Sequence, residues 1–407
     1  MKGSSDHVLR CIACGEAFGA LPEGYRCPSC GDLLEVVLRA AMAPEGFWTL
    51  RRGALGVWAF RRALPSVGRE PVSLGEGGTP LLRVKNLAEL SPLEHVYVKY
   101  EGQNPTGSFK DRGMTVAVSL ALRYGARVLL CASTGNTAAS LAAYAARAGR
   151  RALVLVPKGL VARGKLAQAQ AYGALVVEVE GNFDTALGLV TRLASGGSGL
   201  FLLNSINPYR LEGQKTLAYE LVLQLGRAPD YVVLPVGNGG NISALWKGFT
   251  ELKAWRIITT LPRLVAVQAE GAAPIAHAFN RGLEGLEPVA APHTLATAIN
   301  IGRPALWKKA LRALQESGGL ALTVSDEEIL AAKSRLASGE GLFVEAASAA
   351  PLAALYRLKH SLPRNALVVC VATGSGLKDR ELVEERAPQP LSVKGEEALS
   401  SLLKKLF

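Results

Sequence analysis

The chain has 407 residues, of which 49% are hydrophobic and 20% are charged, a composition typical of a globular protein with a large buried core. No uncharged stretch is long enough to span a membrane and no apolar signal core follows the N-terminus, so no membrane partner and a cytoplasmic location are expected. The formal net charge of +12 is spread along the chain without a basic block, which does not favour a nucleic-acid partner. An anionic cofactor and an anionic substrate would suit the same positive field.

Near the N-terminus, four cysteines form two closely spaced pairs. Cys11 and Cys14 make one C-x-x-C pair, Cys27 and Cys30 make the other, and a glycine follows each pair. Two such knuckles can converge on one metal ion and complete a tetrahedral zinc site of four thiolates, with disulfides or redox chemistry as the alternatives. Four thiolates leave no open coordination position, so the pattern predicts a structural zinc in a small ribbon module over residues 1–40.

The segment from Asn104 to Gly113 places one lysine between a Pro/Gly turn and an apolar helical pattern. Ser108 is expected to cap the helix predicted over residues 114–124. Lys110 would then lie on a rigid element with its amine facing the loop, where an aldehyde can form a Schiff base. The alternative is an ordinary loop lysine beside a helix start.

From residue 114 to residue 204 the sequence alternates between helical and strand patterns. Helices are predicted over 114–124, 136–148, 163–172 and 183–194, and strands over 127–132, 151–156, 174–179 and 200–204. Regular alternation of strand and helix indicates a parallel sheet with helices on both faces.

Three strand patterns run directly into polar, glycine-rich turns. These turns begin at Ser133, at Gly237 and at Thr373, and the first two lead into helical patterns. A turn of this kind at a helix N-terminus presents free backbone N–H groups to an anion. Any one of them alone could be an ordinary strand-to-helix turn. Because ligands of open α/β sheets bind beyond the carboxyl ends of the strands, the three turns and Lys110 predict a single cofactor pocket.

In their order along the chain, these motifs resemble those of threonine synthase, a pyridoxal-phosphate enzyme of the tryptophan-synthase-β structural group. The resemblance covers roughly residues 70–380, and it departs from the family pattern at Ser375, where histidine is frequent, and at Ala346, where proline is usual. The matching segments are Leu74–Leu81, Asn104–Gly113 for the Schiff-base motif, Ser133–Thr137, Gly237–Asn241 with Trp246–Phe249 for the phosphate loop, and Thr373–Asp379.

The resemblance implies an α/β protein of pyridoxal-phosphate fold type II, with two open three-layer domains built on parallel sheets behind the four-cysteine zinc ribbon. The expected parts are a connector over 41–70, a large cofactor-binding domain over 71–113 and 206–390, a small mobile domain over 114–205, and a helical tail over 391–407. A homodimer is also expected.

The resemblance also implies a role for each site residue. Lys110 is expected to bind pyridoxal phosphate as an imine and then to act as the catalytic base and acid. The other expected cofactor contacts are Asn136 to the phenolic oxygen, the backbone of Gly237, Asn238, Gly239, Gly240 and Asn241 to the phosphate, and Thr373 to the pyridine nitrogen. Glu345 is expected to lie behind these contacts.

The implied reaction converts O-phospho-L-homoserine and water to L-threonine and phosphate by γ-elimination and β-addition of water. The substrate carboxylate is expected at Ser133, Thr134 and Thr137, and the substrate phosphate at Asn204, Ser205 and Arg210. Several alternatives remain open: cysteate synthase acting on O-phosphoserine and sulfite, an amino-acid dehydratase, a cofactor-binding homologue without activity, and a zinc-ribbon nucleic-acid-binding protein. The contacts of a pocket with one methylene group contribute only about 1–3 kcal/mol to the free energy by which an enzyme discriminates between two such substrates.

Overall fold

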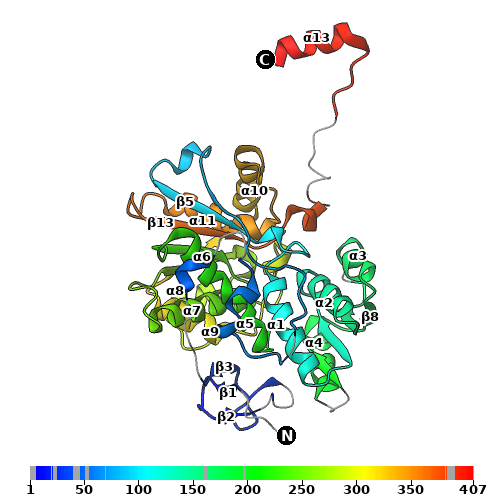
Figure 1. The fold of residues 1–407 in the computed structure, drawn as a ribbon. Coiled ribbons are helices and arrows are strands. Elements are labelled where there is room, and N and C mark those ends of the chain that lie inside the picture. Colours follow the sequence, from blue (N-terminus) through cyan, green and yellow to red (C-terminus); the bar gives the residue numbers. More distant parts are fainter. Residues whose placement is uncertain are drawn as a thin grey trace.

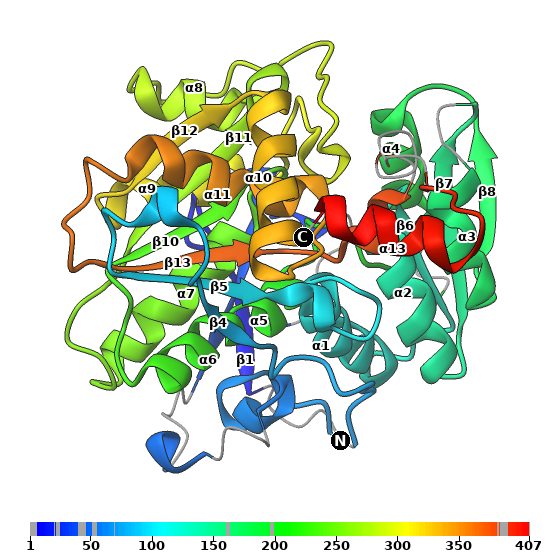
Figure 2. The same ribbon diagram turned by 90° about the horizontal axis from the view of Figure 1, so that it is seen from above.

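The computed structural model describes residues 6–19, 21, 25–39, 46–50, 55–68, 70–159, 163–195, 199–380, 382 and 390–406. Parts of the predicted connector, residues 41–45, 51–54 and 69, lie outside these ranges. The described residues form two larger sheets that lie side by side, and one small antiparallel sheet (Figures 1 and 2). No helix among the described residues is long and apolar enough to cross a membrane.

The largest sheet has six strands in the order β12-β11-β10-β13-β5-β4, and only β4 runs antiparallel to its neighbour. Helices cover both of its faces, which explains why β13 is an uninterrupted apolar run: alternate residues of this strand face opposite helical layers. The strands are β4 (Leu81–Arg83), β5 (His95–Tyr100), β10 (Tyr231–Pro235), β11 (Arg263–Ala269), β12 (Leu320–Val324) and β13 (Leu367–Ala372). The helices are α5 (Tyr209–Gln214), α6 (Thr216–Leu225), α7 (Gly240–Ala254), α8 (Pro274–Asn280), α9 (Trp307–Glu316), α10 (Asp326–Glu340) and α11 (Ala346–Leu358).

The second sheet has four parallel strands in the order β8-β7-β6-β9. It matches the predicted alternation closely, and α1 packs between α2 and α5, so this helix joins the two larger units. Its strands are β6 (Val128–Ala132), β7 (Arg151–Pro157), β8 (Leu175–Val179) and β9 (Leu200–Leu202); its helices are α1 (Lys110–Arg123), α2 (Asn136–Arg147), α3 (Arg163–Ala171) and α4 (Phe183–Ala194).

The smallest sheet contains the cysteine pairs and lies against α5 and α9 (Figure 1). Its antiparallel strands are β1 (His7–Cys11), β2 (Ala17–Phe18) and β3 (Leu34–Leu38), in the order β2-β1-β3. These two larger α/β units behind a small cysteine-bearing sheet confirm the expected fold class.

Short helical turns and a terminal helix complete the described chain. The connector contains two of these turns, and its Phe60 packs edge-on against Tyr219 of α6 with ring centroids 5.2 Å apart. Helix α13 (Gly395–Leu406) lies apart from the body in Figure 1. The turns are η2 (Phe47–Thr49), η4 (Val57–Ala63), η5 (Ala88–Leu90), η6 (Glu101–Gln103), η7 (Glu270–Ala272), η8 (Thr297–Ile299) and η9 (Gly376–Asp379).

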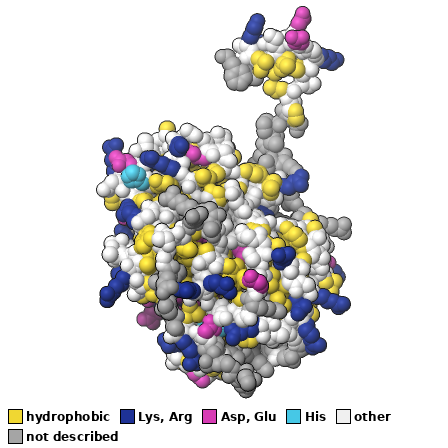
Figure 3. All heavy atoms as spheres, in the orientation of Figure 1, with side chains coloured by type: hydrophobic (Ala, Val, Ile, Leu, Met, Phe, Trp, Pro, Cys, Tyr) yellow, Lys and Arg dark blue, Asp and Glu magenta, His cyan; other side chains and the backbone are white. Residues whose placement is uncertain are grey.

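On the face seen in Figure 3, Lys and Arg side chains are scattered over the body and do not gather into one stripe.

One predicted helix start is wrong. Helix α1 begins at Lys110 instead of residue 114, and Ser108 does not cap it, because the hydroxyl of Ser108 is buried and has no partner among the residues that the structure describes. The backbone of Ser108 instead forms an isolated bridge with Gly374, which ties the lysine loop to the end of β13.

A fully buried charge cluster fixes the first turn of α1. Arg112 pairs with Glu101 at 2.6 Å and with Glu220 at 2.7 Å, and Lys99 pairs with Glu220 at 2.9 Å. Burial alone would raise the pKa of Glu220, but the charges of Arg112 and Lys99 lower it to about 2. The backbone N–H of Gly78 also donates to Glu220, so the Leu74–Leu81 motif anchors this cluster. The residues next to Lys110 are therefore held by both the sheet and α6.

Candidate active site

Lys110 is the first residue of α1 and lies half-buried where the two larger units meet. Its ammonium group is 4.3 Å from the ring centroid of Phe109. Burial, and secondly the charge of Arg210, lower the pKa of Lys110 to about 7, while Glu345 opposes the shift. A neutral amine is the form that attacks an aldehyde, so this environment makes the lysine reactive near neutral pH.

Both larger units hold the loop before Lys110. Asp111 accepts hydrogen bonds from the N–H and the hydroxyl of Thr106, at 2.7 and 2.6 Å, and from the hydroxyl of Ser140 in α2 at 2.5 Å. From the other side, the N–H of Phe109 donates to the carbonyl of Thr373 at 3.0 Å. The lysine is therefore fixed relative to the end of β13 and the start of α2.

The glycine-rich loop after β10 lies at the N-terminus of α7. Gly239 has a φ of +82°, and a Cβ there would lie 3.1 Å from the carbonyl oxygen of Leu306, so glycine is required. The side-chain oxygen of Asn238 accepts from the N–H of Ala305 at 3.0 Å, which braces the loop against the segment before α9. The positive end of the α7 dipole and its free N–H groups suit an anion such as a phosphate.

Several buried polar atoms around this loop have no partner among the described residues. Asn241 has neither amide atom paired, and the side-chain oxygen of Gln214 is also unpaired. The side chain of Gln214 lies near Gly113 in α1 and Gly240 at the start of α7: an ideal Cβ on Gly113 would lie 2.9 Å from its amide nitrogen and one on Gly240 3.7 Å from its amide oxygen. An unpaired buried polar group costs roughly 1–3 kcal/mol, so these atoms fit a bound polar group. The residues present therefore fit a phosphate-bearing cofactor next to Lys110.

Glu345 links the two residues that are expected to contact the edges of the cofactor ring. It precedes α11 and accepts hydrogen bonds from the amide nitrogen of Asn136 at 2.9 Å and from the hydroxyl of Thr373 at 3.3 Å. Burial, and secondly the charge of Asp379, raise the pKa of Glu345 to about 7. Gly374 leaves room for the carboxyl group of Glu345, because a Cβ on Gly374 would lie 2.5 Å from the carboxyl carbon of Glu345. Glu345 is thus more central than the sequence analysis indicated.

The turn after β6 presents Ser133, Thr134 and Thr137 at the N-terminus of α2, and all three are half-buried. The side-chain amide of Asn204 forms two hydrogen bonds with the backbone of Ala132. Its oxygen accepts from the N–H of Ala132 at 2.9 Å, and its nitrogen donates to the carbonyl of Ala132 at 2.8 Å. Asn204 therefore braces the end of β6 in this structure.

Arg210 lies in α5 and is only 1% exposed. One of its terminal nitrogens donates to the carbonyl of Leu203 at 3.1 Å, whereas Nε and Nη2 have no partner in the described part of the chain. Burial lowers the pKa of Arg210 to about 10, which leaves it charged at neutral pH. An ideal Cβ on Gly113 would lie 2.6 Å from the carbonyl oxygen of Arg210, so α5 packs closely against the first turn of α1, which begins at Lys110. Ser205, three residues beyond the end of β9, is half-buried. The site thus holds a second group suited to an anion.

The four N-terminal cysteine sulfurs lie within 4.8 Å of one another. Cys11 and Cys30 are 3.4 Å apart, and Cys14 lies 3.6 Å from both Cys27 and Cys30. Four thiolates at the usual Zn–S distance on a tetrahedron would be separated by about 3.8 Å. The cluster therefore fits one zinc ion.

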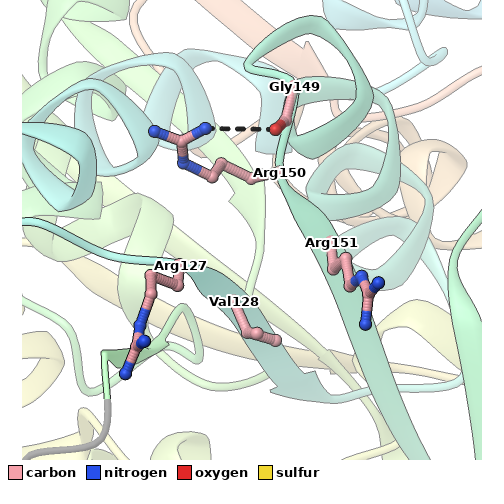
Figure 4. A pocket seen from close by; sticks show the side chains of 5 residues that line it. All are labelled: Arg127, Val128, Gly149, Arg150 and Arg151. Atoms are coloured by element: carbon pink, nitrogen blue, oxygen red, sulfur yellow. Dashed lines mark hydrogen bonds between the residues drawn. The ribbon is translucent and has the colours of Figure 1, made fainter.

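An open hollow on the second sheet lies at the wrong end for this chemistry. It is lined by Arg127, Val128, Gly149, Arg150 and Arg151, and Figure 4 shows Arg150 bonded to the carbonyl of Gly149. These residues lie at the amino ends of β6 and β7, whereas the site described above lies at the carboxyl ends of the strands. The hollow is therefore separate from the candidate active site.

The fold and the site together define a pyridoxal-phosphate-dependent enzyme. The family described as "Pyridoxal-phosphate dependent enzyme" matches residues 72–374. The crystal structure of a threonine deaminase from T.th. is similar, with a TM-score of 0.61 and 30% identity over 77% of this chain and 94% of that chain. An aspartate racemase structure gives a TM-score of 0.60 and 25% identity over 73% of this chain and 90% of that chain.

Curated relatives narrow the family further. Threonine synthase from Methanocaldococcus jannaschii is 48% identical over 98% of this chain and 100% of its own length. Threonine synthase from Synechocystis is 52% identical over 79% of this chain and 82% of its own length. The chain belongs to the threonine synthase family, which confirms the resemblance found in the sequence.

Proposed function

We propose that this protein converts O-phospho-L-homoserine and water to L-threonine and inorganic phosphate, with pyridoxal phosphate as its cofactor. The observation that carries the proposal is the pairing of two separate anion sites around Lys110. One is the glycine loop with the side-chain amide of Asn241, and the other is the guanidinium of Arg210, whose Nε and Nη2 have no partner among the described residues. One site suits a cofactor phosphate, and the other suits the phosphate of the substrate.

When bound, pyridoxal phosphate supplies an electron sink for the carbons next to the substrate amine. The amine of Lys110 is proposed to hold the cofactor and, once released by the substrate, to move protons to and from the substrate carbons. A pKa of about 7 allows this side chain to accept and donate protons near neutral pH. Gly237, Asn238, Gly239, Gly240 and Asn241 are proposed to hold the cofactor phosphate, mainly through backbone N–H groups.

Glu345 is proposed to orient the contacts to the cofactor ring. Its carboxyl group already receives hydrogen bonds from Asn136 and Thr373, which are proposed to contact the phenolic oxygen and the pyridine nitrogen. Because its pKa is about 7, this carboxyl group can change protonation without a large energetic cost when a charged ring binds beside it.

The substrate is proposed to contact the N-terminus of α2 and Arg210 of α5. Ser133, Thr134 and Thr137 receive its carboxylate at the start of α2, and Arg210 with Ser205 receives its phosphate. The Cγ–O bond breaks, and phosphate leaves with the bonding electrons and with the ester oxygen. Cβ loses a proton and receives the hydroxyl group of a water molecule, Cγ gains a proton to become the methyl group, and the remaining proton of the water goes to the released phosphate. Asn204 is proposed to support this site by bracing β6.

The four cysteines are proposed to bind one structural Zn²⁺, because a closed shell of four thiolates offers no position for a substrate. A homodimer and a cytoplasmic location stay predictions. The nucleic-acid-binding alternative is not favoured, because threonine synthase relatives match the chain from the ribbon through the cofactor domain.

The test is an assay of phosphate release by the pyridoxal-phosphate-loaded enzyme. We expect release from O-phospho-L-homoserine with stoichiometric L-threonine, and little release from O-phosphoserine with or without sulfite. Sulfite-dependent release from O-phosphoserine, with no threonine formed from O-phospho-L-homoserine, would instead identify a cysteate synthase.

A further inference from the structure

The cysteine-bearing sheet packs directly against the segment that carries the proposed substrate-phosphate residues. We call residues 201–214 the phosphate arm; they run from the end of β9 through α5. The hydroxyl of Tyr25 accepts a hydrogen bond from the N–H of Leu202 at 2.7 Å, and its ring meets Phe201 edge-on with centroids 5.8 Å apart. Tyr25 is 4% exposed and has a φ of +62°, which is rare for a residue of this size. The contact is therefore buried and geometrically specific.

A second contact from this sheet reaches the neighbour of Arg210. His7 is 1% exposed, and its Nε2 lies 3.1 Å from the hydroxyl oxygen of Tyr209. The two rings meet edge-on with centroids 5.5 Å apart, and Tyr209 is completely buried. The hydroxyl of Tyr209 also lies 3.0 Å from that of Tyr124, which follows the last residue of α1. His7 thus fixes the residue that precedes Arg210 at the start of α5.

A third contact holds the middle of α5. Lys247 donates to the carbonyl of Val36 in β3 at 2.6 Å and also pairs with Glu212 in α5. Glu212 is 1% exposed and also pairs with Lys215 at 2.6 Å. The cysteine-bearing module therefore contacts the phosphate arm at three places: directly at Leu202 and at Tyr209, and through Lys247 at Glu212.

Two of the residues that make these contacts lie close to cysteines in the sequence. Cys11 is the last residue of β1, whose first residue is His7, and Cys27 follows Tyr25 by two positions. An ion held by the four thiolates joins the strand that carries His7 to the turn that carries Tyr25. Without that ion, the two side chains belong to loosely connected segments of a sheet too small to be stable alone.

We propose that the zinc ribbon is a positioning device for substrate phosphate binding, in which Tyr25 and His7 hold the phosphate arm so that Arg210 faces the site. This inference rests on the proposed role of Arg210. Neither Tyr25 nor His7 touches the substrate. Their loss changes the affinity for a phosphorylated ligand and leaves cofactor binding and the maximal rate nearly unchanged.

The experiment compares Tyr25→Phe with Arg312→Gln in the zinc- and cofactor-loaded enzyme. Tyr25→Phe removes only the acceptor of the Leu202 N–H. Arg312→Gln is the matched control, because it breaks a 3.2 Å contact between α9 and Glu35 in β3 that does not involve the phosphate arm. We expect Tyr25→Phe to raise the Kd of inorganic phosphate and the KM of O-phospho-L-homoserine about three- to tenfold, with kcat within about twofold. The control should change neither quantity.

Hydrogen exchange measured by mass spectrometry supplies a readout that does not depend on activity. We expect faster exchange over the phosphate arm in Tyr25→Phe and in the metal-depleted enzyme, with exchange in β10 and β13 unchanged. If Tyr25→Phe does not fold, His7→Gln in the same two measurements tests the second contact.

Arg210→Ala separates the two proposals. If Arg210→Ala weakens phosphate binding but Tyr25→Phe and His7→Gln do not, the positioning role is refuted and the proposed function stands. If Arg210→Ala leaves phosphate binding unchanged, the proposed phosphate site and the positioning role both fail. Uniformly faster exchange across the whole chain would show a general loss of stability and would also overturn the positioning role.

Discussion

Replacing Arg210 with alanine should remove most of the binding energy for the substrate phosphate. The guanidinium group is buried, and two of its three nitrogens have no partner among the described residues, so a ligand oxyanion can use both. A charge-assisted, bidentate contact in such a site is worth roughly 2–4 kcal/mol, so kcat/KM for O-phospho-L-homoserine should fall about 30- to 1000-fold. Lysine at this position should restore only part of the loss, because it lacks the planar fork.

The assay is steady-state phosphate release, with the cofactor absorbance spectrum recorded on the same sample. Arg151→Ala is the matched control, since it removes one positive charge from an exposed position at the far end of the second sheet. We expect normal kinetics in the control and an unchanged cofactor spectrum in both variants. Normal turnover by Arg210→Ala, or loss of its cofactor, would refute the assignment of the substrate phosphate to this residue.

Three further predictions concern the lysine, the central carboxyl group and the metal. Because burial lowers the pKa of Lys110 to about 7, cofactor uptake by the apoenzyme should accelerate about tenfold per pH unit below that value and level off above it; a rate that keeps rising to pH 10 would show an ordinary lysine. Glu345→Ala loses two accepted hydrogen bonds and should weaken cofactor binding about 5- to 30-fold in an absorbance titration, whereas Glu345→Gln should cost less than about threefold; equal losses would argue against a positioning role. Elemental analysis should find one zinc per chain, and Cys11→Ser should lower Tm while kcat per cofactor-loaded site is kept; loss of kcat with the fold and cofactor content intact would indicate a catalytic metal.

The arrangement of strands and glycine loops could be predicted because it depends on local patterns. Helices α2 and α4 and strand β6 lie within one or two residues of their predicted ranges, because their apolar periodicity is strong and their boundaries are marked by polar turns. The expectation of one site for these loops and Lys110 rests on one general rule, that the carboxyl ends of parallel strands meet at the same edge of a sheet.

The start of α1 could not be predicted from local patterns. Residues 110–113 are polar and have the composition of a loop, yet Asp111 and Arg112 are buried. The partners of Arg112, Glu101 and Glu220, come from other parts of the chain, and hydrophobic periodicity cannot reveal a buried ion pair between distant segments. Ser108 likewise pairs with Gly374, which is distant in the sequence, and does not cap the helix.

Two features of the site were missed or underestimated. Gln214 is an ordinary polar residue of a short helix in the sequence, and only the packing of Gly113 and Gly240 around it shows that it faces the cofactor loop. Glu345 is expected behind the cofactor contacts, but its hydrogen bonds from Asn136 and Thr373 could not be predicted, because they join segments far apart in the chain. Nothing in the local sequence pattern marks Gln214 as a site residue.

The most direct test of the proposed reaction follows the water oxygen. The loaded enzyme is supplied with O-phospho-L-homoserine in water enriched in oxygen-18, and both products are analysed by mass spectrometry. Cleavage of the Cγ–O bond and addition of water at Cβ predict one heavy oxygen in the threonine hydroxyl group and none in the released phosphate. Heavy oxygen in the phosphate, with homoserine as the second product, would show hydrolysis of the P–O bond and would contradict the proposed function.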